Sequence, residues 1–299
     1  MTRYTLLFVI MFILNACEQQ GPLDLAALEG RARSGDQQAT EQLVTLLGHT
    51  ENNLNMQAYK ILLDLGKKAA PALIKEIDSD SSERREHVIA ALGTLQVRAA
   101  VPEISAVLAN TKSGRRYIAA WALGEIADPA GIPALIAALD DPDHQVRRYA
   151  TRSLIKLNRA AVPPLLDVLS AGSVRAVAGA IRALGDIGDQ RALDALLQQL
   201  SGEHRSEAIL ALGKLKDRRA AAAMISALDD PDWRIRMNAA MALGPLGGPA
   251  AVESLRKTLE DEVRVVREWS ARSLEMITGE HVLYRNNAGD YVPPYNIYH

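Results

Sequence analysis

The side chains that most often carry out chemistry are scattered along this sequence. Its histidines are far apart, and no HExxH, CxxC, GxSxG or phosphate-binding glycine loop occurs. These are the patterns that bring metal ligands, nucleophiles or phosphate donors together. We therefore predict a non-catalytic protein with no metal site and no cofactor. The six histidines are His49, His87, His144, His204, His281 and His299.

Composition indicates a folded chain and excludes several classes of protein. Of the 299 residues, 48% are hydrophobic and 23% are charged, which argues against intrinsic disorder. Lys and Arg number 34 against 36 Asp and Glu, and this balance argues against a general nucleic-acid binder. The single cysteine excludes an internal disulfide framework.

The start of the chain has the pattern of an export signal. Arg3 precedes the apolar run Leu6–Leu14, which is too short to span about 30 Å of hydrocarbon as a helix. The run ends in Leu14-Asn15-Ala16-Cys17, which resembles the lipobox of bacterial lipoproteins. That resemblance implies that residues 1–16 are removed and that Cys17 carries a covalent lipid such as palmitate. An ordinary secretory signal with a chance cysteine, or a membrane-associated segment, remains the alternative.

The predicted lipid anchor has consequences for location. Two or three acyl chains make release from a membrane negligible. The residue after the lipidated cysteine is Glu18, and the resemblance to lipoproteins then favours the periplasmic face of the outer membrane. Residues 17–35 are expected to form the lipidated N-terminus, a short tether and a first helix.

An internal repeat covers most of the remaining chain. The pattern A-x-x-A-L-G recurs, and a second amphipathic segment precedes each copy, so each unit is predicted to be two helices. The glycine after most of the leucines is expected to allow a close turn into the next unit. The repeat leucines are Leu62, Leu92, Leu123, Leu154, Leu184, Leu212, Leu243 and Leu274.

These units resemble the HEAT-like repeats of the phycobilisome-lyase type, whose consensus contains I-P-x-L-I, then D-P, then V-R and A-L-G. The segments Ile132–Leu139 and Asp140–Asp143 match it closely. The resemblance predicts an all-α fold, an α-solenoid of about eight two-helix repeats over residues 36–279.

An arginine stands seven residues before most of the repeat leucines. In HEAT-like repeats this arginine usually pairs with acidic turn residues, so we interpret the column as structural rather than as a basic binding ladder. Asp128, Asp189 and Asp217 are expected to be partners. The column consists of Arg85, Arg116, Arg147, Arg205, Arg236 and Arg267.

One face of the second helices is predicted to bind a partner. Residues six and two before the leucine, and two after it, share a face through i, i+4 spacing. In HEAT-like solenoids this face is concave, and here it has a basic centre between apolar ends. It would suit an acidic or amphipathic protein segment; a merely solvated helix face is the alternative. The proposed residues are Tyr117, Trp121, Arg148, Arg152, Lys156, Arg182, Lys214, Met237 and Met241.

The tail, residues 280–299, differs in composition from the repeats. It contains Tyr284, Tyr291, Tyr295 and Tyr298 together with Pro293-Pro294, and Asn286–Gly289 could turn a small hairpin. A solenoid needs a cap where its last apolar face would meet water. We therefore predict a C-terminal cap, with a partner-docking segment as the alternative.

Two enzyme families share this repeat. HEAT-repeat hydroxylases bind two irons through His-Glu pairs, but here the order is reversed, in Glu86-His87 and Glu203-His204. The bilin lyases share the repeat, and that likeness alone does not transfer their function. The sequence is therefore predicted to encode a membrane-anchored periplasmic scaffold without catalytic activity. The alternatives are a subunit of an envelope complex that docks through its tail, and a HEAT-repeat enzyme of the lyase or hydroxylase type.

Overall fold

The structure is a computed structural model, and it describes residues 24–295. Most of these residues lie in helices, and the repeat leucines Leu62 to Leu274 are buried. The predicted all-α solenoid is therefore confirmed. The predicted signal peptide and the lipidated Cys17 lie outside the described residues. Among residues 24–295, no helix combines the length and the apolar character needed to cross a membrane.

The chain divides into two compact units, with the boundary between Ala91 and Leu92. The first unit contains α2 (Leu25–Arg33), α3 (Gln37–Leu46), α4 (Leu54–Leu65), α5 (Ala70–Lys75) and most of α6 (Ser82–Thr94). Leu43, Leu47, Leu62, Leu73 and Ile77 form its core. Asp24 and Asp36 cap α2 and α3 by accepting hydrogen bonds from backbone N–H groups, which helix N-termini leave unsatisfied.

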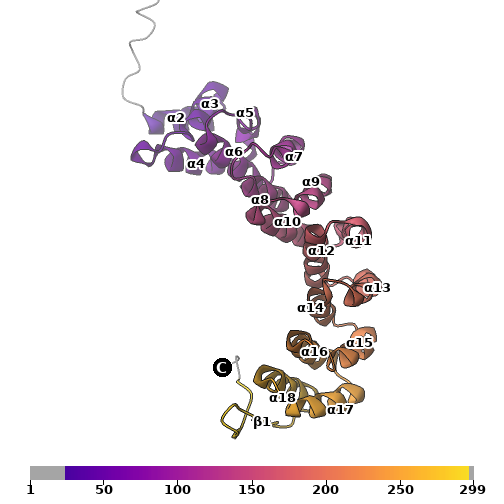
Figure 1. The fold of residues 1–299 in the computed structure, drawn as a ribbon. Helices are drawn as coiled ribbons and strands as arrows, with labels where there is room; N and C mark the ends of the chain where they lie inside the picture. The colour runs from indigo at the N-terminus through magenta and orange to yellow at the C-terminus, as the bar shows by residue number, and fades with distance from the viewer. Residues whose placement is uncertain (1–23, 296–299) are drawn as a thin grey trace, which may run out of the picture. The chain divides into compact units, whose positions relative to one another are not determined.

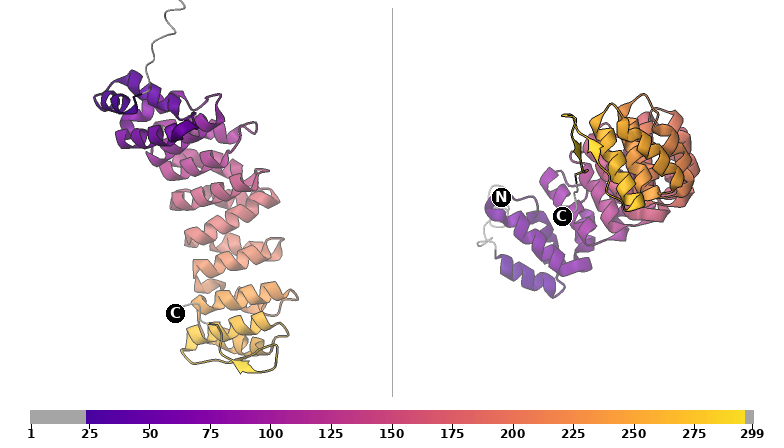
Figure 2. Two further views of the ribbon diagram at one scale, coloured as in Figure 1. Left: turned by 90° about the vertical axis from the view of Figure 1, so that its left-hand side faces the viewer. Right: turned by 90° about the horizontal axis from the view of Figure 1, so that it is seen from below.

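The second unit is a stack of helical hairpins in two layers (Figures 1 and 2). The first helices of the hairpins form one layer: α7 (Val101–Ala109), α9 (Ile132–Ala137), α11 (Val162–Ala171), α13 (Leu193–Gln198), α15 (Ala221–Ala227) and α17 (Pro249–Lys257). The second helices form the other layer, called here the inner layer: α8 (Tyr117–Ile126), α10 (His144–Leu157), α12 (Val174–Ile187), α14 (Arg205–Leu215), α16 (Trp233–Leu246) and α18 (Arg264–Thr278). Figure 1 shows the inner layer on the concave side of this unit.

The repeat glycines have a different role from the expected one. Gly124 and Gly185 lie inside helices, not at turns. A Cβ atom at Gly124 would stand 2.2 Å from Ser153 Oγ of the next repeat, and one at Gly185 would stand 2.7 Å from Ala211 Cα. The missing side chain therefore lets neighbouring inner helices approach closely.

The tail forms the hairpin that its sequence suggested. β1 (Tyr284–Arg285) pairs antiparallel with β2 (Tyr291–Val292), with Tyr284 opposite Val292. Tyr284 is buried, and its hydroxyl accepts a hydrogen bond from Arg264 at 3.2 Å. Arg267 donates to the Arg285 carbonyl at 2.8 Å. These contacts attach the hairpin to α18, the last helix of the solenoid.

Candidate functional site

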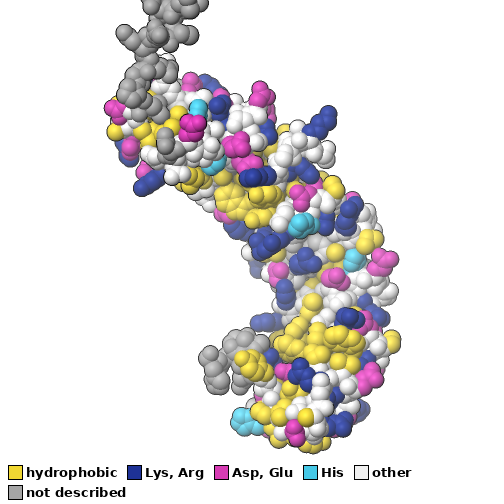
Figure 3. All heavy atoms as spheres, turned by 60° about the vertical axis from the view of Figure 1, so that its left-hand side comes forward, with side chains coloured by type: hydrophobic (Ala, Val, Ile, Leu, Met, Phe, Trp, Pro, Cys, Tyr) yellow, Lys and Arg dark blue, Asp and Glu magenta, His cyan; other side chains and the backbone are white. Residues whose placement is uncertain are grey.

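The residues predicted to bind a partner all lie on the inner layer of the second unit. Helix α8 contributes Tyr117 and Trp121, and α10, α12 and α14 contribute the basic residues, while α16 contributes Met237 and Met241. The three arginines and two lysines are exposed, and the aromatic and methionine residues are half-buried. Figure 3 shows two apolar patches on this face, with basic side chains between them.

Two tyrosines from neighbouring repeats stack at the α8 end of this face. The Tyr117 and Tyr149 ring centroids are 5.3 Å apart, with 28° between the planes. The guanidinium of Arg152 lies over the Tyr149 ring, 5.8 Å from its centroid. Sequence reasoning missed Tyr149 because it stands five residues before Leu154, one position away from the spacing used to define the face.

The basic residues of the face differ in whether they are neutralised. Lys156 pairs with Glu125, and Lys214 pairs with Asp186 at 2.5 Å, so each lysine is matched by the preceding repeat. Arg148, Arg152 and Arg182 make no ion pair or hydrogen bond through their side chains with other residues in the range 24–295. The face thus offers three guanidinium groups, each able to give strong bidentate hydrogen bonds to a carboxylate.

Three of the structural arginines pair with acidic turn residues of the next repeat, but none of them pairs with an aspartate that the sequence analysis singled out. Arg116, Arg205 and Arg236 pair with Asp141, Asp230 and Asp261 of the following repeats. Arg85 and Arg147 instead donate to carbonyls of their own turns, and Arg267 donates to carbonyls of its own turn and of the tail. The expected partners Asp128, Asp189 and Asp217 each cap a short 3-10 helix.

The turn aspartates are held in their charged form. The side chain and backbone N–H of Arg191 donate to Asp189 and lower the pKa of that carboxyl to about 2. Arg219 lowers the pKa of Asp217 in the same way. These hydrogen bonds favour the carboxylate over the acid, so the turns keep their caps at neutral pH.

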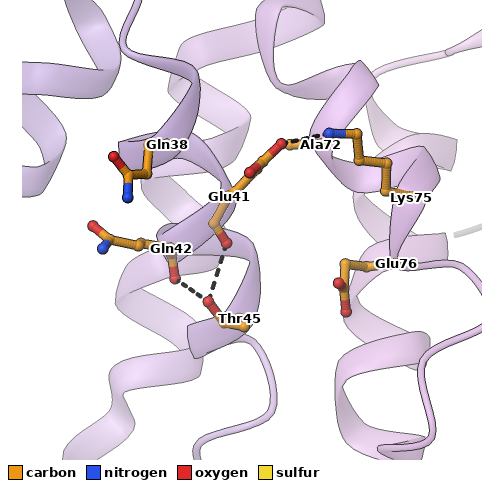
Figure 4. Close-up of a pocket in the computed structure, with 7 residues that line it drawn as sticks. All are labelled: Gln38, Glu41, Gln42, Thr45, Ala72, Lys75 and Glu76. Carbon is orange, nitrogen blue, oxygen red and sulfur yellow. Dashed lines mark hydrogen bonds and ion pairs between the residues drawn. The ribbon is translucent and has the colours of Figure 1, made fainter. Parts of the chain in front are cut away.

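A polar hollow of about 280 Å³ lies in the first unit between α3 and α5 (Figure 4). Its charged groups already have partners: Lys75 pairs with Glu41 at 2.6 Å, and Glu76 pairs with Arg84 at 3.0 Å. We therefore assign no function to it. Its lining residues, none singled out from the sequence, are Gln38, Glu41, Gln42, Thr45, Ala72, Lys75 and Glu76.

A metal site would need several converging ligands. Within the described part of the chain, no three His, Cys, Asp or Glu side chains are grouped so that they could hold a metal ion. The imidazole of His87 instead lies 2.7 Å from the Glu83 carbonyl, through Nδ1, and its ring meets the edge of Tyr59.

The fold and this face define an α-solenoid protein with a polar and aromatic inner surface. The model of the HEAT-repeat family matches residues 70–155, 132–204 and 196–275. These matches cover more than half of the chain, which therefore belongs to the HEAT-repeat family. The crystal structure of Kap121p shares this fold, with a TM-score of 0.61 at 12% identity, covering 80% of this chain and 34% of that one.

Several proteins with similar sequences are named as enzymes or as enzyme subunits. A phycocyanobilin lyase subunit alpha from Picosynechococcus is 31% identical over 179 residues, which cover 56% of this chain and 60% of that protein. Deoxyhypusine hydroxylase from mouse is 43% identical over 84 residues, 27% of this chain and 28% of that enzyme. The chain thus spans 60 to 64% of the length of the phycocyanobilin lyase subunits that it matches.

These relatives correct the functional prediction made from the sequence. The prediction of a binding scaffold without catalytic activity is wrong, because the relatives are named as a lyase subunit and a hydroxylase. The resemblance to repeats of the phycobilisome-lyase type is confirmed by the same matches. Sequence reasoning underrated the enzymes because it looked for a catalytic motif, whereas the likeness lies in the repeats themselves.

Proposed function

We propose that this protein is a subunit of a bilin-lyase-type enzyme and that it binds an open-chain tetrapyrrole on the inner layer of its second unit. Two relatives that match more than half of this chain support the lyase class, since they are named as subunits of phycocyanobilin lyase. The observation that carries the proposal is the group of three unpaired arginines, Arg148, Arg152 and Arg182, beside the stacked Tyr117 and Tyr149.

The chemistry of this face matches that of a bilin. A bilin is a conjugated chain of four pyrrole-type rings with two propionate side chains. Stacked tyrosines offer a flat π surface for such rings, in the offset geometry that aromatic groups prefer. Unpaired guanidinium groups offer charge-assisted hydrogen bonds to the propionates. The half-buried Trp121, one helical turn from Tyr117, extends the apolar surface.

The role of this chain in the proposed reaction is to bind and orient the bilin. No cysteine follows Cys17 in the sequence, so no residue of this face can hold the bilin through a thioether. We propose that the bond to the bilin is made or broken on a partner protein. The name "subunit" of the lyase relatives supports a protein partner for this chain. An acidic or amphipathic segment remains the predicted recognition element on that partner.

A hydroxylase function has less support. The match to deoxyhypusine hydroxylase has a higher sequence identity than the match to the lyase subunit, but it covers a much shorter part of the chain. The described residues offer no set of ligands that fits a metal centre.

Bilin binding is tested by titrating the full chain with phycocyanobilin and following the absorbance of the pigment. The wild type is expected to bind one bilin and to shift its absorbance. The double variant Arg148→Gln/Arg152→Gln is expected to bind at least about tenfold more weakly, because hydrogen bonds to charged groups are worth about 1.5–3 kcal/mol each. The matched control is Arg98→Gln/Arg159→Gln, which removes two exposed arginines elsewhere in the unit. No binding by the wild type, or equal affinity in both variants, contradicts the proposal.

The location of the protein forms a separate proposal. The Leu14-Asn15-Ala16-Cys17 pattern supports a lipid on Cys17 and a place at the periplasmic face of the outer membrane. Mass spectrometry of the mature N-terminus is expected to find a diacylglyceryl group on Cys17, and Cys17→Ser is expected to release the protein from membranes. A mature chain that still contains residues 1–16, or an unmodified Cys17, contradicts this proposal.

A further inference from the structure

Most junctions between inner helices of the second unit are closed by an ion pair with a fixed spacing. Arg116 pairs with Asp141, Arg205 with Asp230, and Arg236 with Asp261, always 25 residues apart. The Arg236–Asp261 pair is bidentate, at 2.7 and 3.0 Å, and both side chains are nearly buried. We call these pairs repeat clamps. They tie α8 to the α10 repeat, α14 to the α16 repeat, and α16 to the α18 repeat.

Smaller polar contacts tie the same helices. Ser153 on α10 donates to the Ala120 carbonyl on α8 at 2.8 Å, and Ser273 on α18 donates to the Ala240 carbonyl on α16 at 2.7 Å. Both hydrogen bonds are buried. Asn238 on α16 donates to Ser206 on α14 at 2.9 Å. A clamped junction therefore has a second polar tie closer to its core.

The α10–α12 junction departs from this pattern at each position. Arg147 reaches only the carbonyls of its own turn, and Gly172 stands 25 residues after it in place of an aspartate. Ala183 replaces the serine that ties the clamped helices. Ile155 on α10 occupies the position that is glycine on α8, α12, α14 and α16, so the close helix contact made by Gly124 is absent here.

The polar contacts that do cross the α10–α12 junction are peripheral. Arg175 pairs with Asp140 at 3.2 Å, and both side chains are about half exposed. Arg191 and Gln199 donate to carbonyls of the preceding repeat at 3.4 Å, but these bonds cross the α12–α14 junction. That junction also has no clamp, since Val177 and Gly202 stand at the two clamp positions, but it keeps the close helix approach at Gly185. Within residues 24–295, no repeat clamp and no buried hydroxyl hydrogen bond crosses the α10–α12 junction.

The unpaired arginines of the proposed bilin site lie on both sides of this junction. Arg148 and Arg152 are on α10, and Arg182 is on α12, where it occupies the same repeat position as Arg152. Their like charges repel one another, so they add no attraction across the junction. A ligand with two carboxylates could bind an arginine on each helix and supply the missing tie.

We propose that the α10–α12 junction is a flexible joint, which closes when a dicarboxylate ligand bridges Arg148 or Arg152 on α10 to Arg182 on α12. The joint follows from the missing ties alone, whereas its closure by a bilin rests on the proposed function. In a solenoid, stability depends on the interfaces between neighbouring repeats, so the weakest interface opens first.

Hydrogen–deuterium exchange of the full chain tests the joint without ligand. Amides of α12 that face α10 are expected to exchange at least about tenfold faster than those of α16 that face α18, because they lack a clamp and a buried tie. The matched variant is Ser153→Ala, which gives α10 the residue that α12 already has at Ala183. It is expected to speed exchange at the α8–α10 junction several-fold and to leave α16 unchanged. Equal amide exchange rates in wild-type α12 and α16 would contradict the proposal of a flexible joint.

The same measurement with phycocyanobilin tests the closure. Saturating bilin is expected to slow exchange in α10 and α12 at least about fivefold, with little change in α16. Arg182→Gln should remove this protection on α12 while some bilin still binds through α10. Binding seen by absorbance without protection at the junction overturns the closure and leaves the proposed function standing. Absence of binding overturns the proposed function and the closure together, while fast exchange in α12 would still establish the joint.

Discussion

The α16–α18 and α10–α12 junctions join equivalent helices of successive repeats, yet they are built differently. At α16–α18, the nearly buried Arg236–Asp261 pair, the Ser273 hydrogen bond and the close approach at Gly244 act together. At α10–α12, the corresponding residues are Gly172, Ala183 and Ile155, and none of these contacts forms. The exposed Arg148, Arg152 and Arg182 lie on the two helices of this junction, and their side chains make no ion pair or hydrogen bond within residues 24–295.

Departures from the repeat pattern of this chain carry information about function. Residues that follow the repeat consensus contribute to stability. Positions that depart from the consensus are expected at functional sites. Here the exceptions coincide with the basic centre of the inner layer.

The largest effect is expected from breaking a buried clamp. Arg236→Ala leaves Asp261 without its charged partner and should lower the free energy of unfolding by about 3–5 kcal/mol. Arg147→Ala, in the same column, removes only hydrogen bonds to the Asp141 and Pro142 carbonyls and should cost about 1–2 kcal/mol. Urea denaturation of both variants measures the difference. Equal losses of unfolding free energy would mean that the Arg236–Asp261 pair stabilises the fold no more than the carbonyl hydrogen bonds of Arg147 do.

A smaller effect is expected from filling the close contact between α8 and α10. Gly124→Ala places a Cβ against Ser153, including 2.9 Å from its backbone Cα, and should destabilise the protein by about 1–3 kcal/mol. The control is Gly30→Ala in α2, where no atom lies within 4 Å of an added Cβ. That change should stabilise the protein by about 0.5–1 kcal/mol, because alanine favours helix over glycine. Thermal denaturation distinguishes the two; a stabilising Gly124→Ala would refute the close approach.

Removing one ring of the stacked pair should weaken bilin binding. Tyr149→Ala takes away the surface that packs on Tyr117, and an aromatic pair is worth about 0.5–1.5 kcal/mol. The affinity for phycocyanobilin is expected to fall about three- to tenfold. Trp269→Ala, which removes a half-buried ring from α18 at the clamped end, is the control. A larger loss of affinity in Trp269→Ala than in Tyr149→Ala would place the bilin site at the α18 end of the inner layer.

The smallest effect on stability is expected from lowering the pH. The pKa of Asp189 is lowered to about 2 in the folded protein, so its carboxylate stabilises the fold fully above the pKa of about 4 that an unfolded chain has. This contribution is lost as the pH falls from about 4 towards 2. Asp189→Asn should therefore lower the melting temperature at pH 7 and make it less sensitive to pH between 4 and 2. An unchanged pH profile would show that the cap contributes no measurable stability.

The fold was predictable because the repeat leucines impose a regular buried row. The spacing of Leu62 to Leu274 indicated two helices per unit, and each of these leucines is buried. The glycines were misread because a sequence position beside a helix end does not reveal the neighbouring helix. Contact between Gly124 and Ser153 depends on how two repeats pack, which periodicity alone does not define.

The candidate site was predictable only in part. Helical spacing placed Tyr117, Arg148, Arg152 and Arg182 on one face, since neighbouring second helices share their orientation. Which cations are neutralised depends on partners a repeat away: Lys156 meets Glu125 and Lys214 meets Asp186, across 31 and 28 residues. The pairing of Tyr117 with Tyr149 likewise crosses repeats.

A crystal structure of the full chain with phycocyanobilin would test the central claim most directly. The account predicts the rings of the bilin against Tyr117 and Tyr149, with its propionates hydrogen-bonded to Arg148 or Arg152 on α10 and to Arg182 on α12. A bilin bound on another face of the second unit, or in the first unit, would contradict it.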